Sequence, residues 1–336
     1  MPVHPVFAEA LPLLEGITSF ETALADPDLA PRVLAFMDAG NGPPPPDADT
    51  SEDAAPGPHG PVPLRIYAPP GDDAPQRPAV VWVHGGGFRM GSVDDPSSDR
   101  TARELSARAG AVVVNVDYRL AVDGVCYPVP HDDVVAALRW VRDHAAELGV
   151  DPARISLGGD SAGGNLAAGA ALRVRDDDGW TPAALLLAYP TLHPVLPPLS
   201  RGLAAAVAGL PELLRFLPAD VEDMHRNYLG GPETTADGYA MPGLALLEGL
   251  PPTLVVNAEY DDLRASGEAF AASLALAGVD VRLVTAPGML HAFLIASDAV
   301  EPAVRVRELL ADTVRTAQSP QSGAVRPLRS AAGSAA

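Results

Sequence analysis

Short apolar runs alternate with longer amphipathic stretches along most of the chain. The runs are rich in Val, Leu or Ile, which is typical of strands buried on both faces of a sheet. They lie at 80–83, 112–116, 154–158, 254–258 and 279–284. The stretches at 134–146 and 267–276 carry apolar residues at helical spacing. Strands that alternate with helices predict an α/β fold with a mostly parallel central sheet and helices on both faces.

Composition and charge indicate one large α/β domain whose partners are expected to be neither nucleic acid nor membranes. The chain has 336 residues, enough for one large α/β domain with a buried core. Its formal net charge of −20 disfavours nucleic acid and anionic membranes as partners, because both are negative. No apolar run reaches the ~18–20 residues of a membrane span, and the N-terminus lacks the basic region and apolar core of a secretory signal. We therefore expect no membrane partner and a cytoplasmic location.

A glycine-rich turn follows the run at 154–158 and opens an alanine-rich stretch. Residues 159–164 read Gly-Asp-Ser-Ala-Gly-Gly, so Ser161 lies at the tip of a predicted strand-turn-helix. Flanking glycines are needed because the turn is strained and the strand and helix leave no room for side chains. In isolation such a turn is as often structural as catalytic, but this setting favours a nucleophilic hydroxyl at a helix N-terminus. That role requires a base and an oxyanion site elsewhere in the chain.

A second glycine motif follows the run at 80–83, where residues 84–88 read His-Gly-Gly-Gly-Phe. Three consecutive glycines cost chain entropy without any return in packing. Their best physical use is to let backbone amides approach a ligand oxygen. We therefore expect the amides of Gly85, Gly86 and Ala162 to form an oxyanion hole. The alternative, a flexible surface loop, is disfavoured by the pairing with the serine turn.

The order and spacing of these segments resemble the hormone-sensitive lipase branch of the α/β-hydrolases, a branch of small bacterial carboxylesterases. The resemblance runs from about residue 64 to about residue 310. It is carried by 84–88, by Tyr-Arg-Leu-Ala at 118–121, by 159–164, by Tyr-Pro at 189–190 and by two C-terminal segments. It implies the α/β-hydrolase fold with a helical cap, and a catalytic order of serine, acid and histidine along the chain.

The acid and the base are therefore expected after Ser161. Asp261 follows the run at 254–258, in the Asp-x-Leu-Arg context of the family's catalytic acid. Its neighbour Asp262 stands where the family usually has proline, so a second carboxylate is a candidate, although we favour Asp261. His291 follows the next run and alone of the eight histidines comes after the acid, which makes it the predicted base.

Three further residues are predicted to support the site. We expect His84 and Gly87 to shape the glycine loop, and Asp160 to hold neighbouring loops by hydrogen bonds rather than to transfer protons. The family usually continues Tyr-Arg-Leu-Ala with Pro-Glu, but residues 122–126 here read Val-Asp-Gly-Val-Cys. This departure affects the expected loop geometry and specificity, not the triad. Cys126 is expected to pack as a small side chain rather than to react.

The resemblance also divides the chain. The expected divisions are N-terminal cap helices at 1–45, the first part of the core at 46–190, a cap insertion at 191–235, the second part of the core at 236–316, and a disordered tail at 317–336. The cap would roof the site and exclude water. The proline-rich, acidic stretch at 41–61 is expected to be an extended linker, and 203–217 a packed helix.

These observations predict a serine hydrolase that cleaves small or short-acyl carboxylic esters through an acyl-enzyme. Its partner would be a small-molecule ester. No organic cofactor is implied, and no histidine pair has metal-ligand spacing with a carboxylate. An amidase, a deacetylase or an elimination enzyme with the same triad remains an alternative. A non-catalytic receptor on this fold is disfavoured, because Ser161, Asp261 and His291 are all present. Homodimers occur among similar proteins, but no segment here specifies an interface.

Overall fold

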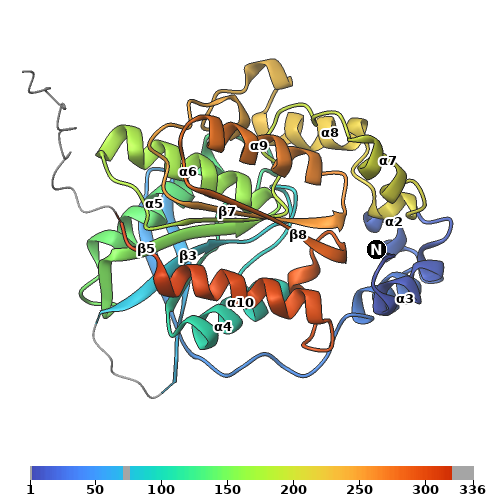
Figure 1. Ribbon diagram of the computed structural model, residues 1–336, viewed down its shortest axis with the longest axis horizontal. Helices are drawn as coiled ribbons and strands as arrows, with labels where there is room; N and C mark the ends of the chain where they lie inside the picture. The colour runs from blue at the N-terminus through green and yellow to red at the C-terminus, as the bar shows by residue number, and fades with distance from the viewer. Residues whose placement is uncertain (1, 71–75, 320–336) are drawn as a thin grey trace, which may run out of the picture.

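The central sheet is the frame of the molecule (Figure 1). The computed structural model describes residues 2–70 and 76–319, and within them the sheet has eight strands in the order β1-β2-β4-β3-β5-β6-β7-β8. The strands are β1 (Asp49–Gly57), β2 (Gly60–Ala68), β3 (Arg77–Val83), β4 (Val112–Val116), β5 (Val150–Asp160), β6 (Leu185–Ala188), β7 (Thr253–Tyr260) and β8 (Val281–Leu290). In this sheet order, each of the six strands from β4 through β3 to β8 is parallel to its neighbours among them. Strand β2 pairs antiparallel with both β1 and β4. The predicted α/β-hydrolase fold is confirmed.

Helices cover both faces of this sheet, as the alternating pattern predicts (Figure 1). On one face lie α5 (Val129–Asp143), α6 (Ala162–Asp178) and α9 (Arg264–Leu276). On the other lie α4 (Pro96–Ala109) and α10 (Glu301–Thr316). A mostly parallel sheet needs this cover because its strands are apolar on both faces.

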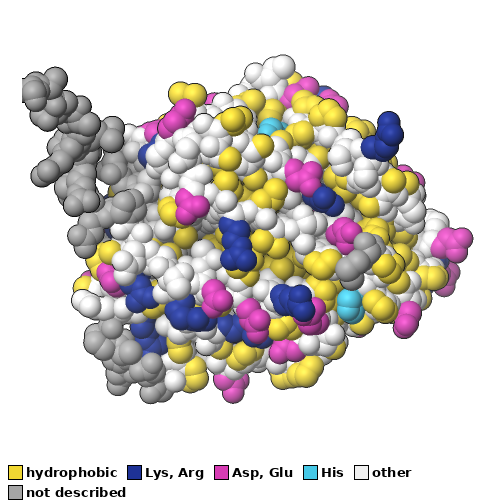
Figure 2. Space-filling view, in the orientation of Figure 1, with side chains coloured by type: hydrophobic (Ala, Val, Ile, Leu, Met, Phe, Trp, Pro, Cys, Tyr) yellow, Lys and Arg dark blue, Asp and Glu magenta, His cyan; other side chains and the backbone are white. Residues whose placement is uncertain are grey.

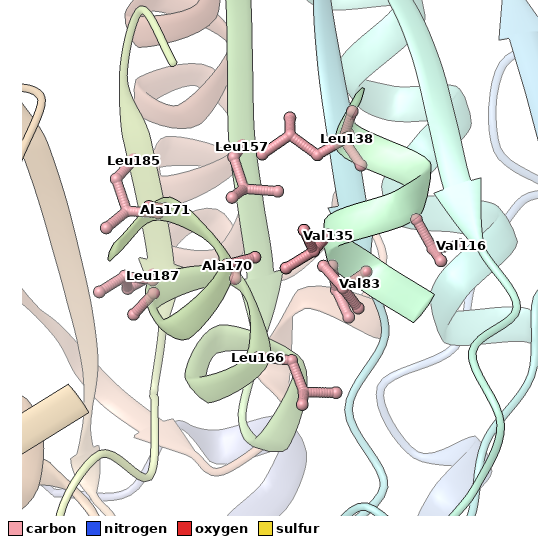
Figure 3. Close-up of a cluster of buried hydrophobic side chains, with 14 of the residues drawn as sticks. Val83, Val116, Val135, Leu138, Leu157, Leu166, Ala170, Ala171, Leu185 and Leu187 are labelled. Atoms are coloured by element: carbon pink, nitrogen blue, oxygen red, sulfur yellow. The ribbon is translucent and has the colours of Figure 1, made fainter. Parts of the chain in front are cut away.

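Alternate side chains of the strands divide the core into two layers. In β3, Val81 and Val83 belong to the layer with α5 and α6, whereas Val80 and Trp82 belong to the layer with α4 and α10. This is the period of two that a strand imposes. Figure 3 shows the first layer, in which Leu and Val side chains lie close to the alanines of α6. Such small side chains allow α6 to lie close to the sheet.

Two expectations about local structure are wrong. The stretch predicted to be a linker contains β1, which pairs with β2 from Asp49 opposite Ala68 to Gly57 opposite Gly60. The apolar pattern misses this edge strand because Ala55 is its only buried residue. The helix predicted at 203–217 ends early: α7 spans Arg201–Val207, and only a short 3-10 turn, η2 (Glu212–Leu214), follows. Pro211 lies between them and lacks the amide that a continuous helix needs.

The N-terminal segment and the insertion after β6 meet in one apolar cluster, which we call the cap cluster. The N-terminal elements are α1 (Pro5–Ala8), η1 (Leu11–Leu14), α2 (Phe20–Ala25) and α3 (Ala30–Asp38), and the insertion adds α8 (Pro218–Leu229) after η2. The buried members of the cluster are Leu14, Ile17, Ala23, Val33 and Leu213. The insertion contributes Leu213 of η2, and its neighbour Leu214 packs against the cluster. The N-terminal segment and the insertion are therefore joined through apolar contacts.

The remaining short elements lie in connections. They are the 3-10 turns η3 (Glu233–Thr235), η4 (Pro242–Leu244) and η5 (Phe293–Ile295). The predicted disordered tail starts within the described residues, where the Ser319 amide donates a hydrogen bond to the Ala153 carbonyl at 2.7 Å. From residue 320 it lies outside them.

The outer surface mixes charges of both signs. Acidic and basic side chains are interspersed over α10 on the face drawn in Figure 2, and within that helix Arg315 pairs with Asp312 at 2.8 Å. Among residues 2–70 and 76–319, no helix has both the length and the apolar character needed to cross a membrane.

Adjacent residues of α3 provide a test of the cap cluster. Val33 is fully buried in the cluster, whereas Leu34 is 51% exposed. We expect Val33→Ala to lower the free energy of local opening of residues 5–38 by about 2 kcal/mol, and Leu34→Ala to change it by less than about 0.5 kcal/mol. Amide hydrogen exchange followed by mass spectrometry measures both. Equal effects of the two substitutions would contradict the packing described.

Candidate active site

Ser161 occupies a strained turn between β5 and α6. Its backbone has φ 54° and ψ −118°, a conformation that residues other than glycine rarely adopt. The turn carries the chain from the last residue of β5 directly into the first turn of α6. The hydroxyl therefore lies at a helix N-terminus, where the partial positive charge favours a developing anion.

Glycine at two positions makes this turn sterically allowed. A Cβ on Gly163 would lie 2.1 Å from the Val83 carbonyl oxygen and 2.4 Å from that of His84. A Cβ on Gly159 would lie 2.5 Å from the Gly163 carbonyl carbon. All three distances are shorter than those that real Cβ atoms show, so the start of α6 packs directly on the end of β3. The same contact brings the glycine loop after β3 next to Ser161.

Three side chains form a row across the carboxyl ends of the strands. His291 Nε2 lies 3.0 Å from Ser161 Oγ, and His291 Nδ1 lies 2.6 Å from Asp261 Oδ2. Ser161 follows β5, Asp261 follows β7 and His291 follows β8. Asp261 is fully buried, and its Oδ1 accepts a hydrogen bond from the Leu263 amide at 2.9 Å. A carboxylate next to Nδ1 favours the tautomer whose Nε2 is free to accept the serine proton.

The neighbouring carboxylate faces a different partner. Asp262 accepts two hydrogen bonds from the Arg215 guanidinium, both at 2.8 Å, and one from the Phe216 amide at 3.0 Å. Of the two candidate acids, Asp261 is thus the one that contacts His291, whereas Asp262 binds residues of the insertion. No pattern in the sequence singled out Arg215 or Phe216, because their partner lies far along the chain.

The glycine loop is ordered by His84. The imidazole is buried and stacks on Tyr118, with ring centroids 4.3 Å apart, while the Tyr118 hydroxyl donates to the His84 carbonyl at 3.1 Å. His84 Nδ1 also lies 2.8 Å from the Gly85 carbonyl oxygen. Burial lowers the pKa of His84, which favours the neutral ring. His84 thus contacts the backbone of the loop.

The predicted oxyanion donors lie around the same turn. Ala162 is the first residue of α6, where amides have no acceptor within the helix. A Cβ on Gly85 would lie 3.2 Å from Ser161 Cβ, which places this residue beside Ser161. The same Cβ would lie 2.6 Å from Asp160 Oδ2, so Gly85 also adjoins the Asp160 carboxylate. Gly86 has φ 117° and Gly87 has φ 59°, so the loop uses the backbone freedom of both glycines.

Asp160 is desolvated beside Ser161. Burial raises its pKa to about 6, an effect that is partly offset by the charge of His291 and by hydrogen bonds. One of these bonds comes from Trp82 Nε1 at 3.3 Å. Asp160 therefore links β3, the glycine loop and the serine turn.

The loop at 122–126, where the sequence departs from the family pattern, is held by hydrogen bonds between the insertion and the residues on either side. The Ala121 carbonyl accepts from the Asn227 side chain at 2.7 Å, and the Tyr127 amide donates to the Tyr228 carbonyl at 2.7 Å. Cys126 is half-buried and lies against Gly230. The loop thus packs on α8. Within the part of the chain that the structure describes, no group of three or more His, Cys, Asp or Glu side chains gathers as metal ligands would.

The raised pKa of Asp160 predicts how the free energy of unfolding depends on pH. A carboxyl whose pKa is higher in the folded state stabilises the fold most when protonated. Its contribution is full below the ordinary pKa of 3.8 and is lost as the pH rises to about 6. Asp160→Asn removes this loss. We therefore expect the free energy of unfolding of the variant, relative to wild type, to rise by about 2 kcal/mol between about pH 4 and pH 7.

Urea unfolding at a series of pH values measures this difference. Asp178→Asn is the control, because the hydrogen bond from Arg139 lowers the pKa of Asp178. That contribution is lost only as the pH falls below 3.8, so the control difference should be nearly constant over the same window. If the free energies of unfolding of wild type and Asp160→Asn change with pH in the same way, the desolvation of Asp160 is contradicted.

Comparisons with known proteins identify the family of the chain. The family model described as the α/β-hydrolase fold matches residues 80–295. Carboxylesterase NlhH of Mycobacterium tuberculosis is 41% identical over 235 residues, which cover 69% of this chain and 71% of the relative. Ethyl acetate hydrolase of Pseudomonas putida is 34% identical over 250 residues, which cover 72% of this chain and 74% of the relative.

A solved structure extends the likeness to nearly the whole chain. The esterase of Pyrobaculum calidifontis superposes with a TM-score of 0.78 at 33% identity, over 94% of this chain and 98% of the esterase. The sequence relatives and the structural neighbour therefore agree on one group of proteins. The chain belongs to the α/β-hydrolase family, in the hormone-sensitive lipase branch of carboxylesterases that its motifs indicate.

Proposed function

We propose that this protein is a serine carboxylesterase that hydrolyses small or short-acyl esters through an acyl-enzyme. The observation that carries the proposal is the row of side chains from Ser161 through His291 to Asp261, with hydrogen-bond distances of 3.0 Å and 2.6 Å. A serine hydroxyl is a weak nucleophile unless a base is within reach of its proton. The row supplies that base and a buried carboxylate to orient it.

The reaction would proceed in two halves. Ser161 Oγ attacks the ester carbonyl while His291 Nε2 takes its proton, and the imidazolium returns this proton to the departing alkoxide. A water molecule, deprotonated by His291, then attacks the acyl-serine and releases the acid. Asp261 stabilises the imidazolium in both halves without itself accepting a proton. None of these steps requires a metal or an organic cofactor.

The tetrahedral oxyanion would be held by backbone amides. We assign this role to Gly85, Gly86 and Ala162, with Gly87 and His84 shaping the loop. Rigid donors that are already in place need no reorganisation as the charge develops, which is the main source of their effect.

The cap supports the assignment of small substrates. The N-terminal helices and the insertion are joined through apolar contacts, and an apolar roof over the triad would exclude water and favour small neutral esters. The names of two relatives, an ethyl acetate hydrolase and a carboxylesterase, point to the same class of substrate. We propose the boundaries 1–45 and 191–235 for this cap.

A series of p-nitrophenyl esters with increasing acyl length tests the proposal. We expect turnover to fall as the acyl chain lengthens, and Ser161→Ala to lower kcat by about 10⁴-fold or more. p-Nitroanilides with matching acyl groups should be hydrolysed far more slowly than the esters. Comparable rates on the anilides would favour an amidase instead. Full activity in Ser161→Ala would overturn the assignment of the nucleophile.

A further inference from the structure

Asp262 connects the insertion to the proposed catalytic histidine. We propose that Asp262 is a positioning residue, which acts through Arg215 to hold Phe216 against His291 and thereby limits the size of the leaving alcohol. The inference rests on the proposed ester hydrolysis and adds a specificity determinant to it. It also gives a physical role to the candidate acid that does not face His291.

The contacts form a closed clamp between the loop after β7 and the loop before α8. Arg215 Nε and Nη2 each lie 2.8 Å from one carboxylate oxygen of Asp262. The Phe216 amide donates to the same carboxylate at 3.0 Å. A bidentate guanidinium–carboxylate pair fixes direction as well as distance. Two consecutive residues of the insertion are therefore held by a single side chain of the core.

Burial makes this clamp stronger than a surface ion pair. The Asp262 side chain is 2% exposed and that of Arg215 is 18% exposed. Removing one partner of such a pair leaves a desolvated charge, whereas exposed pairs contribute little. Asp262 therefore restrains the insertion at this point rather than merely neutralising a charge.

Phe216 transmits the restraint to the triad. Its ring centroid lies 4.6 Å from that of His291, at an interplanar angle of 62°. Tyr189 makes a similar edge contact with the imidazole at 4.8 Å. Thus Asp261 orients the imidazole through a hydrogen bond, and the adjacent Asp262 acts on it through an aromatic contact.

The chemistry indicates which part of the substrate Phe216 restricts. His291 Nε2 must deliver its proton to the departing alkoxide, so the alcohol leaves beside the imidazole. A ring that packs on the imidazole therefore bounds the alcohol side of the site. The backbone amides at Ser161 bind the carbonyl oxygen instead. Loosening the clamp should relax selectivity for the alcohol more than selectivity for the acyl group.

Acetate esters of ethanol, n-butanol and cyclohexanol test this inference, because the acyl group stays constant. We expect Asp262→Asn to lower kcat on ethyl acetate by about tenfold with little change in KM, since the imidazole loses its support. The ratio of kcat/KM on cyclohexyl acetate to that on ethyl acetate should rise by about fivefold. Arg215→Met and Phe216→Leu should shift the ratio in the same direction. The double variant Arg215→Met/Asp262→Asn should shift it no further than either single variant.

Asp178→Asn is the matched control. Asp178 also accepts a bidentate pair, from Arg139 at 2.7 Å and 3.0 Å, but lies at the far end of α6. That end is roughly 24 Å from Ser161 at 1.5 Å per residue. This variant should leave the alcohol ratio within about twofold of wild type.

The outcomes separate the clamp from the proposed function. An unchanged alcohol ratio in Asp262→Asn and in Phe216→Leu overturns the inference, as does an equal loss of activity on all three esters. If Asp262→Asn fails to fold, Phe216→Leu decides alone, because it leaves the ion pair intact. Wild type that hydrolyses no ester overturns the proposed function and the inference with it. If wild type hydrolyses the esters and Ser161→Ala does not, the proposed function is supported, whatever the alcohol ratio shows.

Discussion

The contact of the start of α6 with the end of β3 is the constraint on which the rest of the site depends. Because a Cβ on Gly163 would overlap the Val83 carbonyl, only glycine lets the two elements meet. That contact places Ser161 in its strained conformation and holds the glycine loop beside it. The strain has to be offset by packing elsewhere, and the buried alanines of α6 against the sheet supply such packing.

The proposed catalytic groups depend on this frame to different degrees. Ser161 is held by β5 and α6, which are both buried, whereas His291 lies in a loop after the edge strand β8. A histidine in such a loop needs further support, and it receives this from the Asp261 carboxylate and from two aromatic rings. One of these rings, Phe216, belongs to the insertion. The position of His291 and that of the insertion are therefore physically coupled.

The sequence predicts what local patterns encode. The run at 112–116 coincides with β4, and the glycine motifs identify the serine turn because only a strand-turn-helix requires them. β1 escaped prediction because a single buried side chain makes no pattern. The break after α7 was encoded in Pro211, but the apolar residues around it suggested a longer helix. The pairing of Asp262 with Arg215 could not be predicted, since the two residues are 47 positions apart and meet only in the folded chain.

Direct detection of the acyl-enzyme tests the central claim most directly. Wild type and Asp261→Asn would be mixed with p-nitrophenyl acetate, quenched in acid within the first turnovers, digested and analysed by mass spectrometry. The account predicts one acetyl group on the peptide that contains Ser161, formed much more slowly in Asp261→Asn. Ester hydrolysis with no acetyl group on that peptide, or with the acetyl group on another residue, would contradict it.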